Sequence, residues 1–465
     1  MLKTRIWQSL KSLPAAKRNS FGKFLQSPYF NQREDLFQLF EAIQVAMNKE
    51  QEISKEGIWE ATFSKQKYSA QNLRLLMSYL QKLFEQFIVV ENVIQDKIQI
   101  KLSNASWFRN VGNEKLNKSF LRDSRNILEK QPLRNANYFY QSYQLELERY
   151  KSASRIKPDK GADFQQIVDN LDMAFLGMKL RESCLLLAHD QIYNWGFDDG
   201  FLEKIFEYFQ EKDLLNTPVV SLYFYCYKML QYPEEESWFQ SFKQELLNHS
   251  HLFGKEEAKD LYLMAINRAI RKVNDGFHKY YFDIMDFYKE GLEKEYLLQD
   301  GVLSRFTYHN IVSSALQVDQ ADWAEKFIGT WSVRLERRFR ERMVSFNQAK
   351  IAYHRKDYDA AIPLLQRANY HDQLLNLRAR TLLLRIFYEI EEIDLLQSHL
   401  DAFSSYLRRK SGLGYHRTHY RNLIKYTKRL LALQFSDKEA VLNFKKNVEE
   451  ERLLTDRSWL LGFVI

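Results

Sequence analysis

The stretch that decides the fold is residues 346–368, which read FNQAKIAYHRKDYDAAIPLLQRA. Within it an acidic residue precedes a tyrosine, Asp357-Tyr358, and similar pairs stand 35 residues away on either side, Asp322-Trp323 and Glu392-Ile393. A fixed period of this length is typical of one supersecondary unit, usually a helix pair, stacked on copies of itself. The recurrence therefore predicts a helical-repeat architecture, and architectures of this kind usually serve binding.

The central unit resembles the tetratricopeptide-repeat family. The matches are a small residue in the first helix, an aromatic residue at the turn, and small residues near both ends of the second helix: Ala349, Tyr358, Ala361 and Ala368. Small residues are needed there because two antiparallel helices approach closely only where one presents little side chain. The resemblance implies an all-α, superhelical array of antiparallel helix pairs, a tetratricopeptide-like solenoid that is clearest over residues 307–410.

The two flanking units match the family pattern less closely. Lys326 and Leu396 stand where the period places counterparts of Ala361. We nevertheless expect three stacked helix pairs, with Trp323, Tyr358 and Ile393 in equivalent positions. The layout also resembles long bacterial helical-repeat proteins that carry no assigned function.

Composition supports a helical chain with more than one part. A chain of 465 residues is too long for one ordinary hydrophobic core. Only 15 Gly and 7 Pro are present, and a scarcity of these residues favours long helices joined by short loops. We predict a small, mainly helical N-terminal domain over residues 1–104 and a helical-repeat array over residues 105–465.

The N-terminal region suggests a different class of function. Residues 53–63 and 71–83 are similar to the helix-turn-helix portion of winged-helix regulators, and residues 93–100 alternate enough to form a small hairpin, the wing. The candidate recognition helix offers only Arg74 and Lys82 as cations, fewer than proteins that read a DNA groove usually present. A nucleic-acid-binding transcription regulator is therefore the alternative function rather than the preferred one.

Motifs for chemistry are missing from the sequence. It has no phosphate-binding P-loop, no dinucleotide glycine fingerprint and no nucleophile elbow, so we expect neither an enzyme nor a cofactor. His416 and His419 are too few for a metal site. The two cysteines, Cys184 and Cys226, lie in apolar segments and are interpreted as core thiols of a reduced, cytoplasmic protein. The sequence predicts neither a secretory signal nor a membrane span.

Charge is the one surface signal with a clear location. The formal net charge is +8, and the basic excess lies in residues 331–430, whereas residues 101–330 are net acidic. Spacings of four and three put one set of cations on a single helical face, where like charges repel unless an acidic group is near: Arg417, Arg421, Lys425 and Lys428. A solvated face, an acidic partner and the chain's own acidic section all remain as interpretations.

The preferred function is a non-enzymatic protein-interaction scaffold. Stacked repeats bind partners on a concave surface lined by the first helix of each unit. The resemblance places five further candidate binding residues on that surface: Asn347, Lys350, His354, Arg380 and Arg385. The expected partner is a protein, and an acidic surface on that protein would complement these cations. Nucleic acid is a less favoured partner, and no small-molecule substrate is evident.

Overall fold

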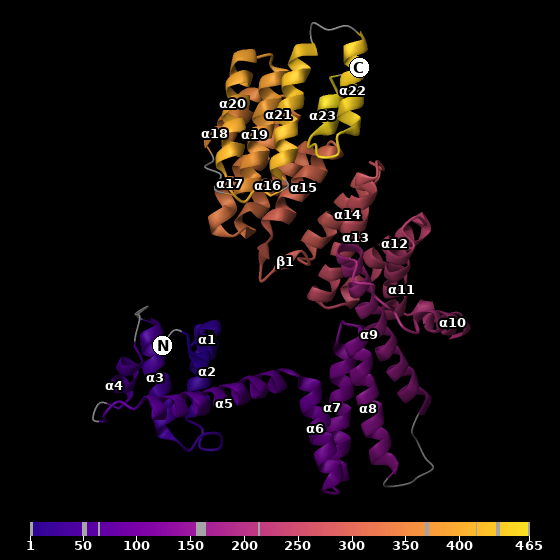
Figure 1. Ribbon diagram of the computed structural model, residues 1–465. Coiled ribbons are helices and arrows are strands. Elements are labelled where there is room, and N and C mark those ends of the chain that lie inside the picture. The colour runs from indigo at the N-terminus through magenta and orange to yellow at the C-terminus, as the bar shows by residue number, and fades with distance from the viewer. Residues whose placement is uncertain are drawn as a thin grey trace. The chain divides into compact units, whose positions relative to one another are not determined.

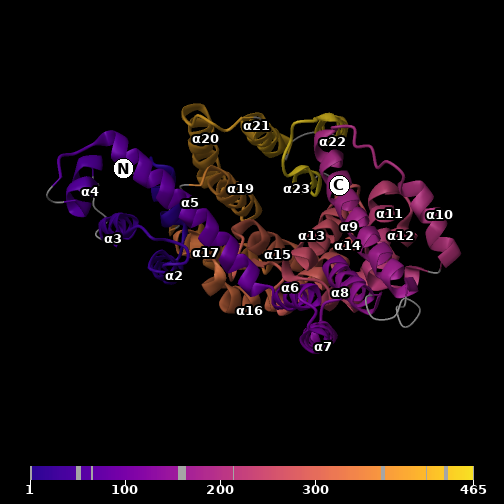
Figure 2. The ribbon, with the colours of Figure 1, turned by 90° about the horizontal axis from the view of Figure 1, so that it is seen from below.

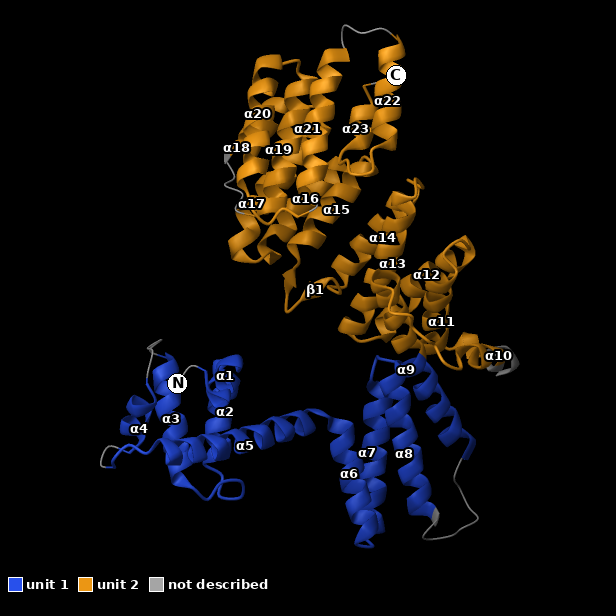
Figure 3. Cartoon of the chain, in the orientation of Figure 1, with its two compact units in different colours: residues 1–179 blue, residues 180–465 orange. Residues whose placement is uncertain are grey.

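The computed structural model describes residues 3–48, 54–63, 66–154, 164–212, 214–367, 372–414, 416–433 and 438–463 (Figure 1). Residue 53 and the repeat position Ala368 lie outside these ranges. The described chain is almost entirely helical, which confirms the predicted all-α class. It divides into two compact units, residues 1–179 and 180–465 (Figure 3). The domain boundary predicted at residue 104 falls inside a helix of the first unit.

Unit 1 contains α1 (Arg5–Ser12), α2 (Ala15–Leu25), α3 (Glu34–Asn48), α4 (Lys55–Thr62), α5 (Ala70–Gln95), α6 (Lys97–Asn110), α7 (Glu114–Lys130) and α8 (Ala136–Ser154). The helix α9 (Phe164–Tyr193) contributes residues to both units. A first hydrophobic core joins α1 to α5, with fully buried Leu10, Phe21 and Leu80 among its members. A second core joins α6, α7 and α8 around Ile98, Leu121 and Leu145. Helices α1 to α5 thus have a core of their own.

The hairpin predicted at residues 93–100 is wrong. Helix α5 continues to Gln95, and α6 starts two residues later, at Lys97. Asp96 between them caps α6, because its carboxylate accepts a hydrogen bond from the Gln99 backbone N–H at 2.9 Å. Capping by an acidic residue stabilises a helix start and here overrides the β-propensity of the valines and isoleucines.

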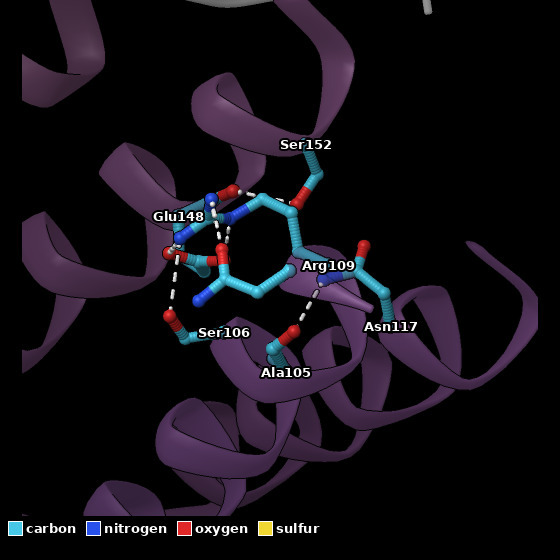
Figure 4. A network of polar contacts seen from close by, with 7 residues as sticks. Ala105, Ser106, Arg109, Asn117, Glu148 and Ser152 are labelled. Atoms are coloured by element: carbon cyan, nitrogen blue, oxygen red, sulfur yellow. Dashed lines mark hydrogen bonds and ion pairs between the residues drawn. The ribbon is translucent and has the colours of Figure 1, made fainter. Parts of the chain in front are cut away.

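A buried polar network holds α6, α7 and α8 together (Figure 4). The Arg109 guanidinium donates to both carboxylate oxygens of Glu148, at 2.6 and 3.3 Å, and to the Ser106 hydroxyl at 3.1 Å. The Asn117 amide donates to the Ala105 carbonyl at 2.8 Å. A two-pronged guanidinium–carboxylate pair fixes distance and orientation together, so this network sets how α6 and α8 pack.

Unit 2 contains, after α9, the helices α10 (Leu202–Lys212), α11 (Pro218–Gln231), α12 (Glu236–His249), α13 (Lys255–Asn274), α14 (Tyr280–Glu293), α15 (Arg305–Gln317), α16 (Ala321–Trp331), α17 (Arg337–His354), α18 (Tyr358–Arg367), α19 (Gln373–Glu389), α20 (Ile393–Arg409), α21 (His416–Leu433), α22 (Lys438–Glu450) and α23 (Arg457–Leu461). Short 3₁₀ turns lie at η1 (Leu214–Asn216), η2 (Ser250–Leu252) and η3 (Ser332–Arg334). Each α-helix from α11 to α23 packs against the next α-helix in the chain. The first helices of successive pairs, α15, α17 and α19, also contact one another (Figure 2).

One small β-hairpin interrupts this array between α14 and α15. Strands β1 (Leu298–Gln299) and β2 (Val302–Leu303) pair antiparallel around Asp300-Gly301. Both turn residues have positive φ, 50° and 77°, as a type I′ turn requires. An Asp-Gly pair is the strongest short-range sequence signal for such a hairpin.

A single kind of turn closes five helix pairs. The second residue after the helix end adopts a left-handed conformation, and the N–H of the following residue bonds to the carbonyl five residues before it. This is the Schellman arrangement, which satisfies carbonyls left over at a helix end. The left-handed residues are Gly112, Gly276, Asp319, Lys356 and Glu391. The helix pairing therefore extends beyond residues 307–410, to α6–α7 and to α13–α14.

These turns correct the register of the predicted repeat. Lys356 and Glu391 are 35 residues apart, as expected, but Asp319 precedes Lys356 by 37. Counted from the turn, Tyr358 and Ile393 are equivalent to Ala321, so the equivalence with Trp323 is wrong by two residues. The shift comes from helix length, because α16 is one residue longer than α18 and α17 is one residue longer than α19.

The corrected register also changes the small-residue position. Ala361 is fully buried, and its counterparts five residues after each left-handed residue are Ala324 and Leu396, both also fully buried. Lys326 is exposed and was compared in error. Two of the three pairs thus have alanine where α16 or α18 meets its neighbours.

Candidate functional site

A cavity of 470 Å³ lies among α15, α17, α19 and α21 of unit 2 and the segment before α23. Two of its walls are helix faces, because Phe346 and Lys350 on α17, and Arg378, Thr381 and Arg385 on α19, follow helical spacing. Among the residues that the structure describes, the lining is His309, Phe346, Lys350, Arg378, Thr381, Leu382, Arg385, His416, His419, Tyr420, Thr455 and Asp456. Cations and imidazoles therefore greatly outnumber the single carboxylate.

A buried hydrogen-bonded pair forms the floor of the cavity. Asn347 is fully buried, and its amide nitrogen donates to the Met343 carbonyl at 2.7 Å. The distance between the Asn347 Oδ1 atom and the His309 Nδ1 atom is 3.0 Å. Because the amide oxygen only accepts, Nδ1 of His309 carries the proton. Burial, together with the positive charges of Lys350 and Arg378, holds the pKa of His309 well below its ordinary value. His309 is therefore neutral at physiological pH.

Lys350 is the most perturbed cation of the cavity. Its ammonium donates to the Ser313 hydroxyl at 2.6 Å, and no ion pair to it exists within the described ranges. Burial, followed by repulsion from Arg378 and Arg385, lowers the pKa of Lys350 to about 7. At neutral pH this side chain is thus divided between charged and uncharged forms, and an anion placed nearby would restore the charge.

The two arginines of α19 differ in their surroundings. Arg385 is ion-paired with Asp456 and lies over the Trp459 ring, 5.8 Å from its centroid. Arg378 is exposed, and the part of the chain that the structure describes offers it neither a hydrogen bond nor an ion pair. A narrower pocket of 50 Å³ shares His309 and Arg378 with the cavity and adds Arg342. The positive surface thus continues past Arg378 toward the start of α17.

The C-terminal helix α23 completes the site by docking on α19. The Trp459 indole N–H donates to Glu389 at 2.8 Å, and the hydroxyls of Tyr353 and Tyr358 donate to the same carboxylate at 2.5 and 2.8 Å. The turn aromatic Tyr358, singled out in the sequence, therefore anchors α19 rather than contacting a partner.

The nine predicted binding residues are not one surface. Lys350 and Arg385 line the cavity, and Asn347 supports it from beneath. His354 instead pairs with Asp319 at 2.9 Å, and Arg380 lies over the Tyr406 ring of α20, with 4.7 Å to its centroid. Asn347 is therefore buried rather than exposed on the predicted concave surface, and His354 and Arg380 each contact another part of the chain.

The four predicted cations of α21 form a separate stripe. Arg417, Arg421, Lys425 and Lys428 are all exposed, as their spacing predicted. Successive residues turn by about 100° around a helix, so this stripe faces away from His416 and His419, which line the cavity. Lys428 pairs with Asp401 of α20 at 2.8 Å, and the Arg417 guanidinium donates to the Lys410 carbonyl at 2.7 Å. The acidic residue that meets the stripe is therefore local, not part of residues 101–330.

Sequence reasoning missed several residues of the cavity. Arg378 and Thr381 precede the predicted Arg385 by seven and four residues, a helical spacing that would have found them. His416 and His419 were considered only as metal ligands. In the described ranges no group of three His, Cys, Asp or Glu side chains is arranged to hold a metal ion. Within those same residues no helix is long and apolar enough to cross a membrane.

Comparisons with known proteins give no further guidance. No family model matches the chain, and searches of curated proteins and of solved structures return no match. The class defined here is therefore that of an all-α protein with a basic cavity among paired helices.

Proposed function

We propose that this chain is a non-enzymatic scaffold whose second unit is a tetratricopeptide-like superhelical array that binds an acidic segment of a partner protein. The observation that carries the proposal is the basic cavity lined by the first helices α15, α17 and α19. Lys350 and Arg378 have no acidic partner among the described residues, and unpaired cations attract acidic groups from outside. The contacts between first helices and the repeated Schellman turns support the array.

The proposed setting is the cytoplasm. Cys184 and Cys226 are both free and fully buried. The Cys184 thiol donates to the Tyr223 carbonyl, with 3.3 Å between the sulfur and the oxygen, and Cys226 packs against Met264. Free thiols used as core residues are common in reducing compartments.

A charge reversal in the cavity tests the scaffold function. Affinity purification from the source organism with the full chain and with Arg378→Glu should show specific partners that the variant loses. Lys115→Glu is the matched control, since Lys115 is exposed on α7 of unit 1 and changes the net charge equally. Identical partners for all three chains would refute binding at this face. If both variants lose the same partners, the net charge of the chain, and not the cavity, causes the binding.

The alternative function, nucleic-acid binding by the N-terminal region, has less support. The helical conformation of residues 93–95 and 97–100 takes away the hairpin that was to serve as the wing. No other observation on α1 to α5 favours DNA, so the scaffold remains the proposal.

A further inference from the structure

The cavity holds positive charge that the protein itself does not neutralise. Among the described residues that line it, the one carboxylate, on Asp456, is already paired with Arg385. Lys350 donates to a neutral hydroxyl, and Arg378 has no polar partner within the described residues. Two cations are thus held close enough to repel each other, which disfavours the empty state unless an anion binds between them.

Two buried polar atoms of residues that line the cavity have no hydrogen-bond partner among the described residues. The Thr381 side chain is 6% exposed and stands between Arg378 and Arg385 on the cavity face of α19, yet its hydroxyl has no hydrogen-bond partner among the residues described. The Nε atom of Arg385 is likewise buried and unpaired there. Buried polar groups in native proteins nearly always have partners, and an orphaned one often marks a ligand position.

The size and the walls of the cavity indicate more than a simple ion. Its 470 Å³ is far larger than one oxyanion, and Phe346, Leu382 and Tyr420 supply apolar and aromatic walls. Pockets with a few converging polar groups on apolar walls are typical of organic ligands. The charged part of the ligand would meet the cations, and its carbon part would lie on these walls.

We propose that this cavity binds a phosphomonoester, with Lys350, Arg378 and Thr381 donating to the phosphate oxygens and Phe346 and Leu382 contacting the organic group. A phosphomonoester carries nearly two negative charges and three acceptor oxygens at neutral pH. Two cations and a hydroxyl match that demand better than they match a carboxylate, which has one charge and two oxygens. The inference rests on the proposed function in using the same face for binding. The phosphate comes either from a phosphorylated partner residue or from a free metabolite.

The decisive experiment is calorimetry on the full chain with three probes. These are inorganic phosphate, phenyl phosphate, and a phosphoserine peptide compared with its unphosphorylated form, and benzoate serves as the carboxylate control for phenyl phosphate. Phenyl phosphate should saturate the site and bind more tightly than inorganic phosphate, because its ring uses the apolar walls. A phosphopeptide that binds better still identifies a partner protein as the source, whereas a weaker one identifies a free metabolite.

Variants locate the binding. Arg378→Gln should weaken phenyl phosphate about 10- to 100-fold, as expected for one lost charge-assisted contact. Thr381→Val keeps the side-chain shape and should weaken it several-fold while the chain remains folded. Arg122→Gln removes the same charge from an exposed position on α7 in unit 1 and should leave the affinity unchanged.

Proton uptake provides a second readout. Because the pKa of Lys350 is about 7, phosphate binding at pH 8 should return a proton to this amine. The measured enthalpy should then depend on the ionisation enthalpy of the buffer, and Lys350→Met should reduce that dependence. His309, Arg378, Arg385, His416, His419 and Asp456 also face the cavity, so each variant needs its own baseline.

Three outcomes would overturn the inference. The first is no saturable binding of phenyl phosphate, and the second is an equal loss from Arg122→Gln and Arg378→Gln. The third is benzoate binding as tightly as phenyl phosphate, which would mean a carboxylate site. That third result would not contradict the scaffold function. If phosphate binds but Arg378→Glu loses no partner in affinity purification, the anion site is supported and the scaffold function is not.

Discussion

The left-handed turn between α13 and α14 can be tested by one chemical change made at two places. Gly276 has φ of 97° and closes the turn, where the Phe277 N–H bonds to the Lys272 carbonyl at 3.0 Å. Gly329 lies in the regular helix α16 of the same unit. A Cβ added at either position meets no atom within 4 Å. Replacing each glycine by alanine therefore isolates the backbone effect from any steric clash.

The two substitutions should have opposite signs. At Gly276, the left-handed conformation costs an L-residue about 1–2 kcal/mol, and the lower entropy of the unfolded alanine chain offsets about 0.4–1 kcal/mol. Gly276→Ala should thus destabilise unit 2 by about 1 kcal/mol. At Gly329, alanine should stabilise the helix by about 1 kcal/mol. The expected separation between the variants is about 2 kcal/mol.

Urea unfolding followed by circular dichroism at 222 nm measures this separation. The slopes of the two transitions should agree, so that the midpoints report stability. If Gly276→Ala is neutral or stabilising while Gly329→Ala behaves as expected, the Schellman turn is not required there. The same reasoning for Asp319, Lys356 and Glu391 would then fail as well.

Four further outcomes follow from the structure. Ala361→Leu should overpack α18 and cost about 1–3 kcal/mol in urea unfolding, whereas Ala360→Leu on the exposed side should be nearly neutral; equal effects would contradict the corrected register. Because the pKa of Lys350 is lowered to about 7, the unfolded chain binds more protons above that pH, so between pH 7 and 9 the unfolding free energy should rise with pH more steeply than in Lys350→Met; parallel curves would contradict the lowered pKa. The full chain should bind duplex DNA only at the non-specific level, a Kd of about 10⁻⁴–10⁻⁶ M at physiological salt in a fluorescence anisotropy titration, and sequence-selective nanomolar binding would favour a transcription regulator. Charge reversal of the α21 stripe should abolish capture of an acidic partner in affinity purification without lowering helical content by circular dichroism, and unchanged capture would make it a solvated face; the replaced residues are Arg417, Arg421, Lys425 and Lys428.

The sequence predicts local structure well where one residue type dominates the choice. Pro14 and Ser27-Pro28 lie at the two ends of α2, and Leu36, Leu39 and Ile43, three and four residues apart, are buried on one face of α3. These signals succeed because proline and apolar periodicity act within a few residues. The hairpin at residues 93–100 failed because a single cap, Asp96, outweighs several β-branched residues.

The cavity was harder to predict because it is built from helices that are distant in sequence. His309, Lys350, Arg378 and Asp456 come from four segments, and nothing in the residues near each one indicates that they converge. The repeat period brought attention to Lys350 and Arg385. It could not separate Asn347, which is buried, from an exposed neighbour, since both fit a helix equally well.

The docking of α23 has a consequence for the order of folding. Each Schellman-closed hairpin can form from neighbours in the chain, so the helix pairs need no distant contact to begin folding. The cavity differs, since Asp456 and Thr455 reach it only when Trp459 meets Glu389, 70 residues earlier in the chain. Ligand binding would therefore distinguish a finished chain from one that has every hairpin but an undocked end. In a refolding time course, the helical circular dichroism signal should return before ligand affinity does. The delay between the two would measure how slowly α23 docks on α19.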